Sequence, residues 1–130
     1  GAQPEFQPAA VEALVRTWYS DENSIVVERM RAAVGQRLTP LLLDILHQGV
    51  ADGEFSLGSA EGTASVFTSL MLGLNDVAIR LFLGRRDGTV ALERVTCTLK
   101  AYADAFERIL GLPPMSWPLV DPATVTYCFA

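Results

Sequence analysis

The sequence contains few of the residues from which metal sites and catalytic centres are built. Its single histidine is His47, and its two cysteines, Cys97 and Cys128, lie far apart along the chain of 130 residues. A structural zinc site needs about four ligands, and no cysteine has the spacing of a zinc or redox motif. The sequence therefore predicts no metal site and no cofactor, and both thiols are expected to stay reduced, as in the cytosol.

Basic residues are also scarce. The chain has 10 Lys and Arg against 15 Asp and Glu, which gives a net charge of -5. A protein surface that binds DNA needs an excess of positive charge to displace counterions from the phosphates. These residues are therefore not expected to bind nucleic acid by themselves.

No apolar run is uninterrupted over the length of a membrane span. The most apolar run, residues 66–83, is broken by Asn75, Asp76 and Arg80, whereas a span needs about 20 mostly apolar residues. The sequence opens without the pattern of a signal peptide. We therefore expect a cytoplasmic protein that has no contact with a membrane.

Apolar residues are abundant, since they make up 50% of the chain, and they recur with helical spacing. That spacing predicts helices over residues 8–20 and 24–34. Gly35 and Pro40 are expected to interrupt the second helix, with a kink or a fresh start near Thr39, before it continues to about residue 52. Gly53 is expected to end it in a left-handed conformation, and Phe55 to fold back onto the helix end.

Two longer helices are predicted over residues 59–83 and 89–110, joined by a tight turn at 84–88 and with Thr89 as a cap. The first is apolar on two faces, so one face is expected to pack on the core and the other on a second chain. Within it, Asp76 and Arg80 are spaced for an ion pair. The second helix has a column of small residues, which would allow a close helix crossing: Cys97, Ala101 and Ala105.

Together these patterns predict an all-α fold, a bundle of about five helices with no convincing strand. Residues 1–7 are interpreted as an expression scar or a linker, and residues 8–112 as one domain. Residues 113–130 form a tail whose aromatic side chains are expected to lie on that domain: Trp117, Tyr127 and Phe129.

The segment from Gln48 to Phe55 reads Gln-Gly-Val-Ala-Asp-Gly-Glu-Phe. This pattern of two glycines and a phenylalanine at the end of a predicted helix resembles the same part of the ligand-binding domain of TetR-family transcriptional regulators. The resemblance covers roughly residues 8–112. It implies a homodimer whose last two long helices pair with those of the mate as a four-helix bundle. It also implies an apolar ligand pocket formed by the earlier helices. DNA would be bound only through an N-terminal helix-turn-helix domain of about 50 residues that is absent from this chain.

Candidate site residues follow from the helix faces and from this resemblance. His47 and Asn75 are candidates for polar contacts with a ligand, and Trp18, Phe67 and Met71 for apolar walls. Each has a structural alternative. For His47 it is an exposed helix end, for Asn75 a solvated or interface-rim position beside the Asp76–Arg80 pair, and for the other three core packing. The candidate dimer-interface residues are Leu72, Gly73, Ile79, Leu83, Cys97, Ala101 and Ala105.

The resulting hypothesis is the ligand-sensing and dimerisation domain of a TetR-like regulator, a repressor released from DNA by a small, mostly apolar effector. The alternative is a constitutive helical dimerisation or interaction module without a ligand. An enzyme is not expected, because the sequence shows no paired inward carboxylates, no Glu-x-x-His and no activated nucleophile.

Overall fold

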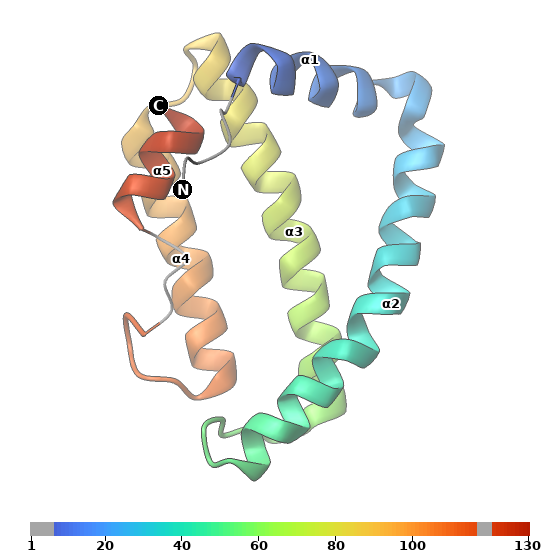
Figure 1. Cartoon of the computed structure of the whole chain (residues 1–130), viewed down its shortest axis with the longest axis vertical. Coiled ribbons are helices and arrows are strands. Elements are labelled where there is room, and N and C mark those ends of the chain that lie inside the picture. The colour runs from blue at the N-terminus through green and yellow to red at the C-terminus, as the bar shows by residue number, and fades with distance from the viewer. Residues whose placement is uncertain (1–6, 117–120) are drawn as a thin grey trace, which may run out of the picture.

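A computed structural model describes residues 7–116 and 121–130 (Figure 1). Those residues form five α-helices, one short 3-10 helix and no strand, so the prediction of an all-α bundle of about five helices is confirmed. In chain order the elements are α1 (Pro8–Trp18), η1 (Asp21–Asn23), α2 (Ser24–Ala51), α3 (Ala60–Asp87), α4 (Leu92–Leu110) and α5 (Pro122–Phe129).

The other helices pack around α3, which is the central helix. As Figure 1 shows, α2 runs antiparallel to α3 on one side and α4 runs antiparallel to it on the other, while α1 crosses one end between α2 and α3. The short α5 packs against both α3 and α4. Asp121 starts α5 as an N-cap, since its carboxylate accepts from the Thr124 backbone N–H at 3.3 Å, and Val125 buries the helix against the core.

The predicted break in the second helix is wrong in one respect, because α2 is continuous from Ser24 to Ala51 and passes through both Gly35 and Pro40. Figure 1 shows a bend in the middle of α2 instead of a fresh start. Proline lacks the N–H that would close the local helical turn, and this loss bends the helix. The Thr39 hydroxyl donates to the Gly35 carbonyl at 2.9 Å and so adds a hydrogen bond next to the one that is lost.

The end of α2 has the predicted geometry. Gly53 has a φ of +75°, and the backbone N–H of Phe55 donates to the Gly49 carbonyl at 3.2 Å. The Phe55 ring then lies over the buried Gly49, in the space that a Cβ would occupy there. A glycine is required at position 49 because the ring packs directly on the backbone.

The connection between α3 and α4 differs from the prediction. α3 extends to Asp87, and α4 begins only at Leu92, with Ala91 as an N-cap that makes no side-chain hydrogen bond. Thr89 stabilises the end of α3 and does not cap α4, because its backbone N–H and its hydroxyl both donate to the Gly84 carbonyl, at 2.9 and 3.3 Å. Val90 packs so closely on Gly84 that a Cβ there would collide with it.

The core consists of two clusters along α3. In the first, Phe67 of α3 packs on Phe106 of α4 with ring centroids 4.7 Å apart, together with Leu46, Ala64 and Leu110. In the second, Leu81 packs with Val95, Leu99 and Val125. The second apolar face of α3, expected to need another chain, lies against α2 of the same chain, where a Leu72 methyl is 3.7 Å from the Cβ position of Gly35.

Among the described helices, α3 alone is long and apolar enough to cross a membrane, with a mean hydropathy of 1.5 in its most apolar window. Length and composition are weak grounds for a span, since the core helix of a water-soluble protein has the same properties. In this fold α3 is the central helix and packs against α1, α2, α4 and α5.

The packing of Phe55 predicts opposite effects for two glycine substitutions in α2. Gly49→Ala should lower the free energy of unfolding by about 1–3 kcal/mol, because the added methyl displaces the ring. Gly35→Ala, where the methyl meets Leu72 at an ordinary 3.7 Å, should raise it by up to about 1 kcal/mol through helix propensity. Urea unfolding of both variants measures the difference, and equal changes would contradict the close ring packing.

Candidate functional site

One side of α2 presents large apolar side chains that stay exposed in the described chain. Val26, Met30, Val34, Leu41 and Ile45 recur at spacings that place them on a single helical face. Each is exposed, with 61% of Leu41 and 58% of Ile45 accessible to solvent. We refer to these five residues as the α2 stripe. A run of large apolar side chains left in water on one face indicates a binding surface.

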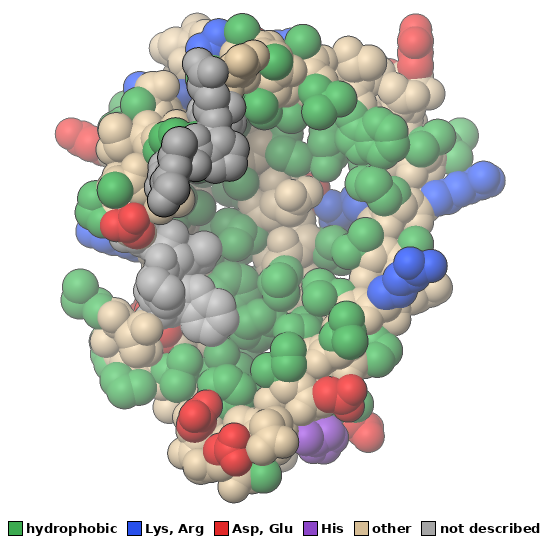
Figure 2. All heavy atoms as spheres, in the orientation of Figure 1, with side chains coloured by type: hydrophobic (Ala, Val, Ile, Leu, Met, Phe, Trp, Pro, Cys, Tyr) green, Lys and Arg blue, Asp and Glu red, His purple; other side chains and the backbone are tan. Residues whose placement is uncertain are grey.

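The neighbouring side of α3 adds to this surface. Met71 and Asn75 lie one turn apart and are exposed, and the antiparallel pairing of α2 and α3 puts them on the same side of the helix pair as the α2 stripe. We call the α2 stripe together with Met71 and Asn75 the front face. Figure 2 shows hydrophobic side chains gathered over the hollow between α2 and the central helix.

The structure separates the five ligand candidates. Met71, 36% exposed, and Asn75 lie on the front face, and the Asn75 amide donates to the Tyr19 hydroxyl at 3.4 Å. Trp18 is 37% exposed at the end of α1. Phe67, one turn before Met71, is buried in the core beneath this face. His47 is exposed on a side of α2 that faces neither α3 nor the front face.

The α2 stripe was not among the candidates derived from the sequence. Its periodicity is visible there, because Val26, Met30 and Val34 follow one another at four-residue spacing. Periodicity alone cannot say whether an apolar face meets the core or a ligand. The face of α2 that does meet α3 carries Val27, which is buried, and the smaller or polar residues Arg31 and Gly35.

Polar side chains join α2 to α3 beside the front face. Arg31 pairs with Asp76 at 2.5 Å, and the hydroxyl oxygens of Thr39 and the buried Thr68 lie 2.9 Å apart. The expected pair of Asp76 with Arg80 is therefore wrong. Asp76 turns to α2 because Arg31 is held opposite it by the helix packing, an arrangement that local spacing cannot reveal.

Ion pairs attach α1 to the end of α3. Arg16 contacts Glu12 at 3.1 Å and Asp87 at 2.7 Å, and Arg86 contacts Glu12 at 3.3 Å. We call these four residues the α1 clamp. Since no residue of α1 is fully buried, the clamp is a main attachment of this helix. The hydrogen bond from Arg16 lowers the pKa of Glu12, an effect that Arg86 strengthens, and the same pairing raises the pKa of Arg16.

The candidate dimer-interface residues fall on two different sides of the molecule. Leu72, Ile79 and Leu83 share one face of α3, partly buried on the side of α2. The others share the opposite side of the α3–α4 pair, away from the front face: Gly73, Cys97, Ala101 and Ala105. We call those four residues the back face. The Tyr102 hydroxyl lies 3.7 Å from the Cβ position of Gly73, so the Tyr102 side chain reaches across from α4 to α3 there.

The described residues contain no group of three or more histidine, cysteine or carboxylate side chains that could hold a metal ion. Within the same part of the chain, every buried side-chain nitrogen or oxygen has a hydrogen-bond partner. Cys97 is exposed and Cys128 is partly buried, and both are free thiols. The surfaces that stand out in the described chain are the apolar front face and the small-residue back face.

The α1 clamp predicts a pH-dependent contribution to stability. Because the folded-state pKa of Glu12 is lowered, its contribution is present at neutral pH, starts to fall as the pH drops below the ordinary carboxyl pKa, and is lost through the lower folded-state value. The urea midpoint should therefore fall as the pH drops from about 5 to 3, and less so in Glu12→Gln. Glu54→Gln, an exposed carboxylate outside the clamp, is the control, and an equal change in both variants would contradict the role of the clamp.

Comparison with known proteins leaves the chain without an identified relative. No protein-family model matches it. No curated protein and no solved structure matches it either.

Proposed function

We propose that this chain is the ligand-sensing and dimerisation domain of a TetR-like transcriptional regulator. In this proposal a small, mostly apolar effector binds the front face, and two copies associate through the back faces of their α3 and α4 helices. DNA would be bound by a helix-turn-helix domain attached before α1, in the cytoplasm. The observation that carries the proposal is the exposed apolar surface shared by α2 and α3.

The composition of the front face supports an apolar ligand. Sites for small molecules are mostly apolar and contain a few polar groups that orient the ligand. The α2 stripe and Met71 supply apolar contact, and methionine adapts to ligands of different shape. The Asn75 amide, linked to the Tyr19 hydroxyl, supplies the polar contact.

The back face supports close pairing of two copies. Its residues Gly73, Ala101 and Ala105 have small side chains, and small side chains at a contact reduce the distance between helix axes. Two copies related by a twofold axis would bring four long helices together, with the same residues on both sides of the contact. The regulator hypothesis expects a four-helix arrangement of this kind.

The connection of the front face to the back face through α3 supports a ligand sensor rather than a dimerisation module without a ligand. α3 carries parts of the front face and of the back face, and its C-terminal end is attached to α1 by the α1 clamp. A ligand that favours one position of α3 would shift the populations of two dimer states, by as much as its affinities for them differ. Because the α1 clamp attaches α1 to α3, a change in the position of α3 would also move a domain attached before α1.

A neutral apolar dye tests ligand binding. Nile red should fluoresce when added to the protein, and Met71→Glu should weaken its affinity at least tenfold, because a charge placed in an apolar site must be desolvated. Leu14→Glu, at an apolar position of α1 that is 69% exposed, introduces the same charge outside the front face and should change little. Equal losses in the two variants, or no binding to the unaltered chain, would refute a ligand site on the front face.

Light scattering tests dimerisation. The unaltered chain should have the mass of a dimer at micromolar concentration, and Ala101→Arg should reduce it to that of a monomer, because the two large, like-charged side chains that it introduces cannot fit a close helix contact. Ala51→Arg, an exposed alanine at the end of α2, should leave the dimer intact. A monomeric unaltered chain would rule out this pairing, whereas a dimer that binds no apolar ligand would favour the constitutive interaction module.

A further inference from the structure

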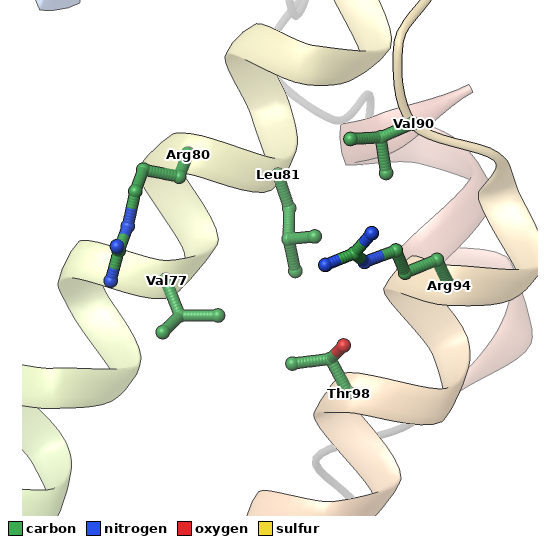
Figure 3. Close-up of a pocket in the computed structure, with 6 residues that line it drawn as sticks. All are labelled: Val77, Arg80, Leu81, Val90, Arg94 and Thr98. Atoms are coloured by element: carbon green, nitrogen blue, oxygen red, sulfur yellow. The ribbon is translucent and has the colours of Figure 1, made fainter.

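A cavity of about 340 Å³ lies on the back of the α3–α4 pair, near the turn that joins the two helices (Figure 3). Its apolar lining comes from Val77, Leu81 and Val90, and its polar lining from Arg80, Arg94 and Thr98. The volume lies at the small end of the range for sites that bind small molecules. It is separate from the front face, which lies on the other side of α3.

The two arginines of this cavity have no ionic partner among the residues that the structure describes. Arg16, Arg31, Arg86 and Arg108 each pair with a carboxylate, and Arg85 donates to two backbone carbonyls. Within the described part of the chain, no carboxylate lies within ion-pair distance of Arg80 or Arg94. Both arginines are exposed, so their guanidinium groups are accessible to an anion from solution.

The position of Arg94 adds to the positive potential. It lies in the first turn of α4, and its helix has no side-chain N-cap. The start of a helix carries a partial positive charge, so a cation is normally disfavoured there and an anion favoured. Figure 3 shows the Arg94 guanidinium reaching toward α3 between Leu81, Val90 and Thr98, while the Arg80 side chain extends along α3 at the edge of the cavity.

We propose that this cavity binds a small organic carboxylate whose apolar part contacts Val77, Leu81 and Val90. The carboxylate would accept hydrogen bonds from the Arg94 guanidinium, and Thr98 can donate a further one. Arg80 would contribute longer-range attraction from the cavity edge. This site goes beyond the proposed function, because it needs neither the front face nor an apolar, uncharged effector.

Its position also connects it to the back face. Arg80 lies seven residues after Gly73 on α3, and Arg94 lies seven residues before Ala101 on α4. Residues seven apart share a helical face, so the cavity extends the back face toward the α3–α4 turn. An acid bound there would be able to influence the pairing of two copies.

Benzoate and its neutral analogue benzamide test the proposal on the complete chain. Benzoate should bind with one site per chain, raise the melting temperature according to mass action, and shift the backbone amide resonances of residues 90, 94 and 98. Benzamide should bind at least tenfold more weakly. Arg94→Gln should weaken benzoate binding about tenfold, since a charge-assisted hydrogen bond is lost, and Arg80→Gln by a smaller factor.

Two further variants separate the site from general electrostatics and from misfolding. Arg29→Gln removes the same charge at an exposed position of α2 and should leave benzoate binding unchanged. Thr98→Leu keeps both arginines, removes the hydroxyl and narrows the cavity, and it should weaken benzoate binding while circular dichroism stays that of the unaltered chain. Nile red binding to the front face should be the same in all four variants, so failure of this site is distinct from failure of the proposed function.

Several outcomes would overturn the proposal. Benzoate that does not bind, or that binds equally well to Arg94→Gln, shows that the cavity is not a carboxylate site. Sulfate that binds as tightly as benzoate shows that the apolar walls contribute nothing and that only general anion attraction is present. Equal weakening by Arg29→Gln and Arg94→Gln leads to the same conclusion.

Discussion

The central position of α3 is the constraint on which the rest of this fold depends. This helix is apolar around most of its circumference, so it must be covered on more than one side to be stable in water. α4 covers one side through the contact of Phe67 with Phe106, and α2 covers another through Gly35 and Leu72. α5 adds cover through Val125. Each of these contacts fixes the rotation of a helix about its own axis.

The functional surfaces are consequences of that rotation. Val27 and Gly35 face α3, and the α2 stripe lies about one quarter turn away from them around the helix. Its apolar side chains therefore point into solvent beside Met71 and Asn75. Once Val95 and Leu99 are buried in the core, Ala101 and Ala105 are turned to the opposite side of the molecule from the front face. Binding on one side and pairing on the other therefore require no separate structural elements.

The same packing decides which charges are paired. Asp76 is paired with Arg31 across the α2–α3 contact and not with Arg80, which lines the cavity beside α4. Glu12, Arg16, Arg86 and Asp87 pair with one another and attach α1 to the end of α3. The acidic net charge of the chain thus coexists with a local positive site formed by Arg80 and Arg94.

The sequence by itself determined the helical class and most helix ends, because both depend on neighbours in the chain. The 3.6-residue periodicity indicated the helices, and Gly53 and Gly111 ended two of them through a left-handed conformation that other residues rarely adopt. Tertiary structure decided the continuity of α2 through Pro40, the partner of Asp76, the cover of Leu72 by α2 and the exposure of the α2 stripe. Each of these depends on which face of one helix meets another, and an apolar pattern has the same form whether it meets a core, a ligand or a second chain.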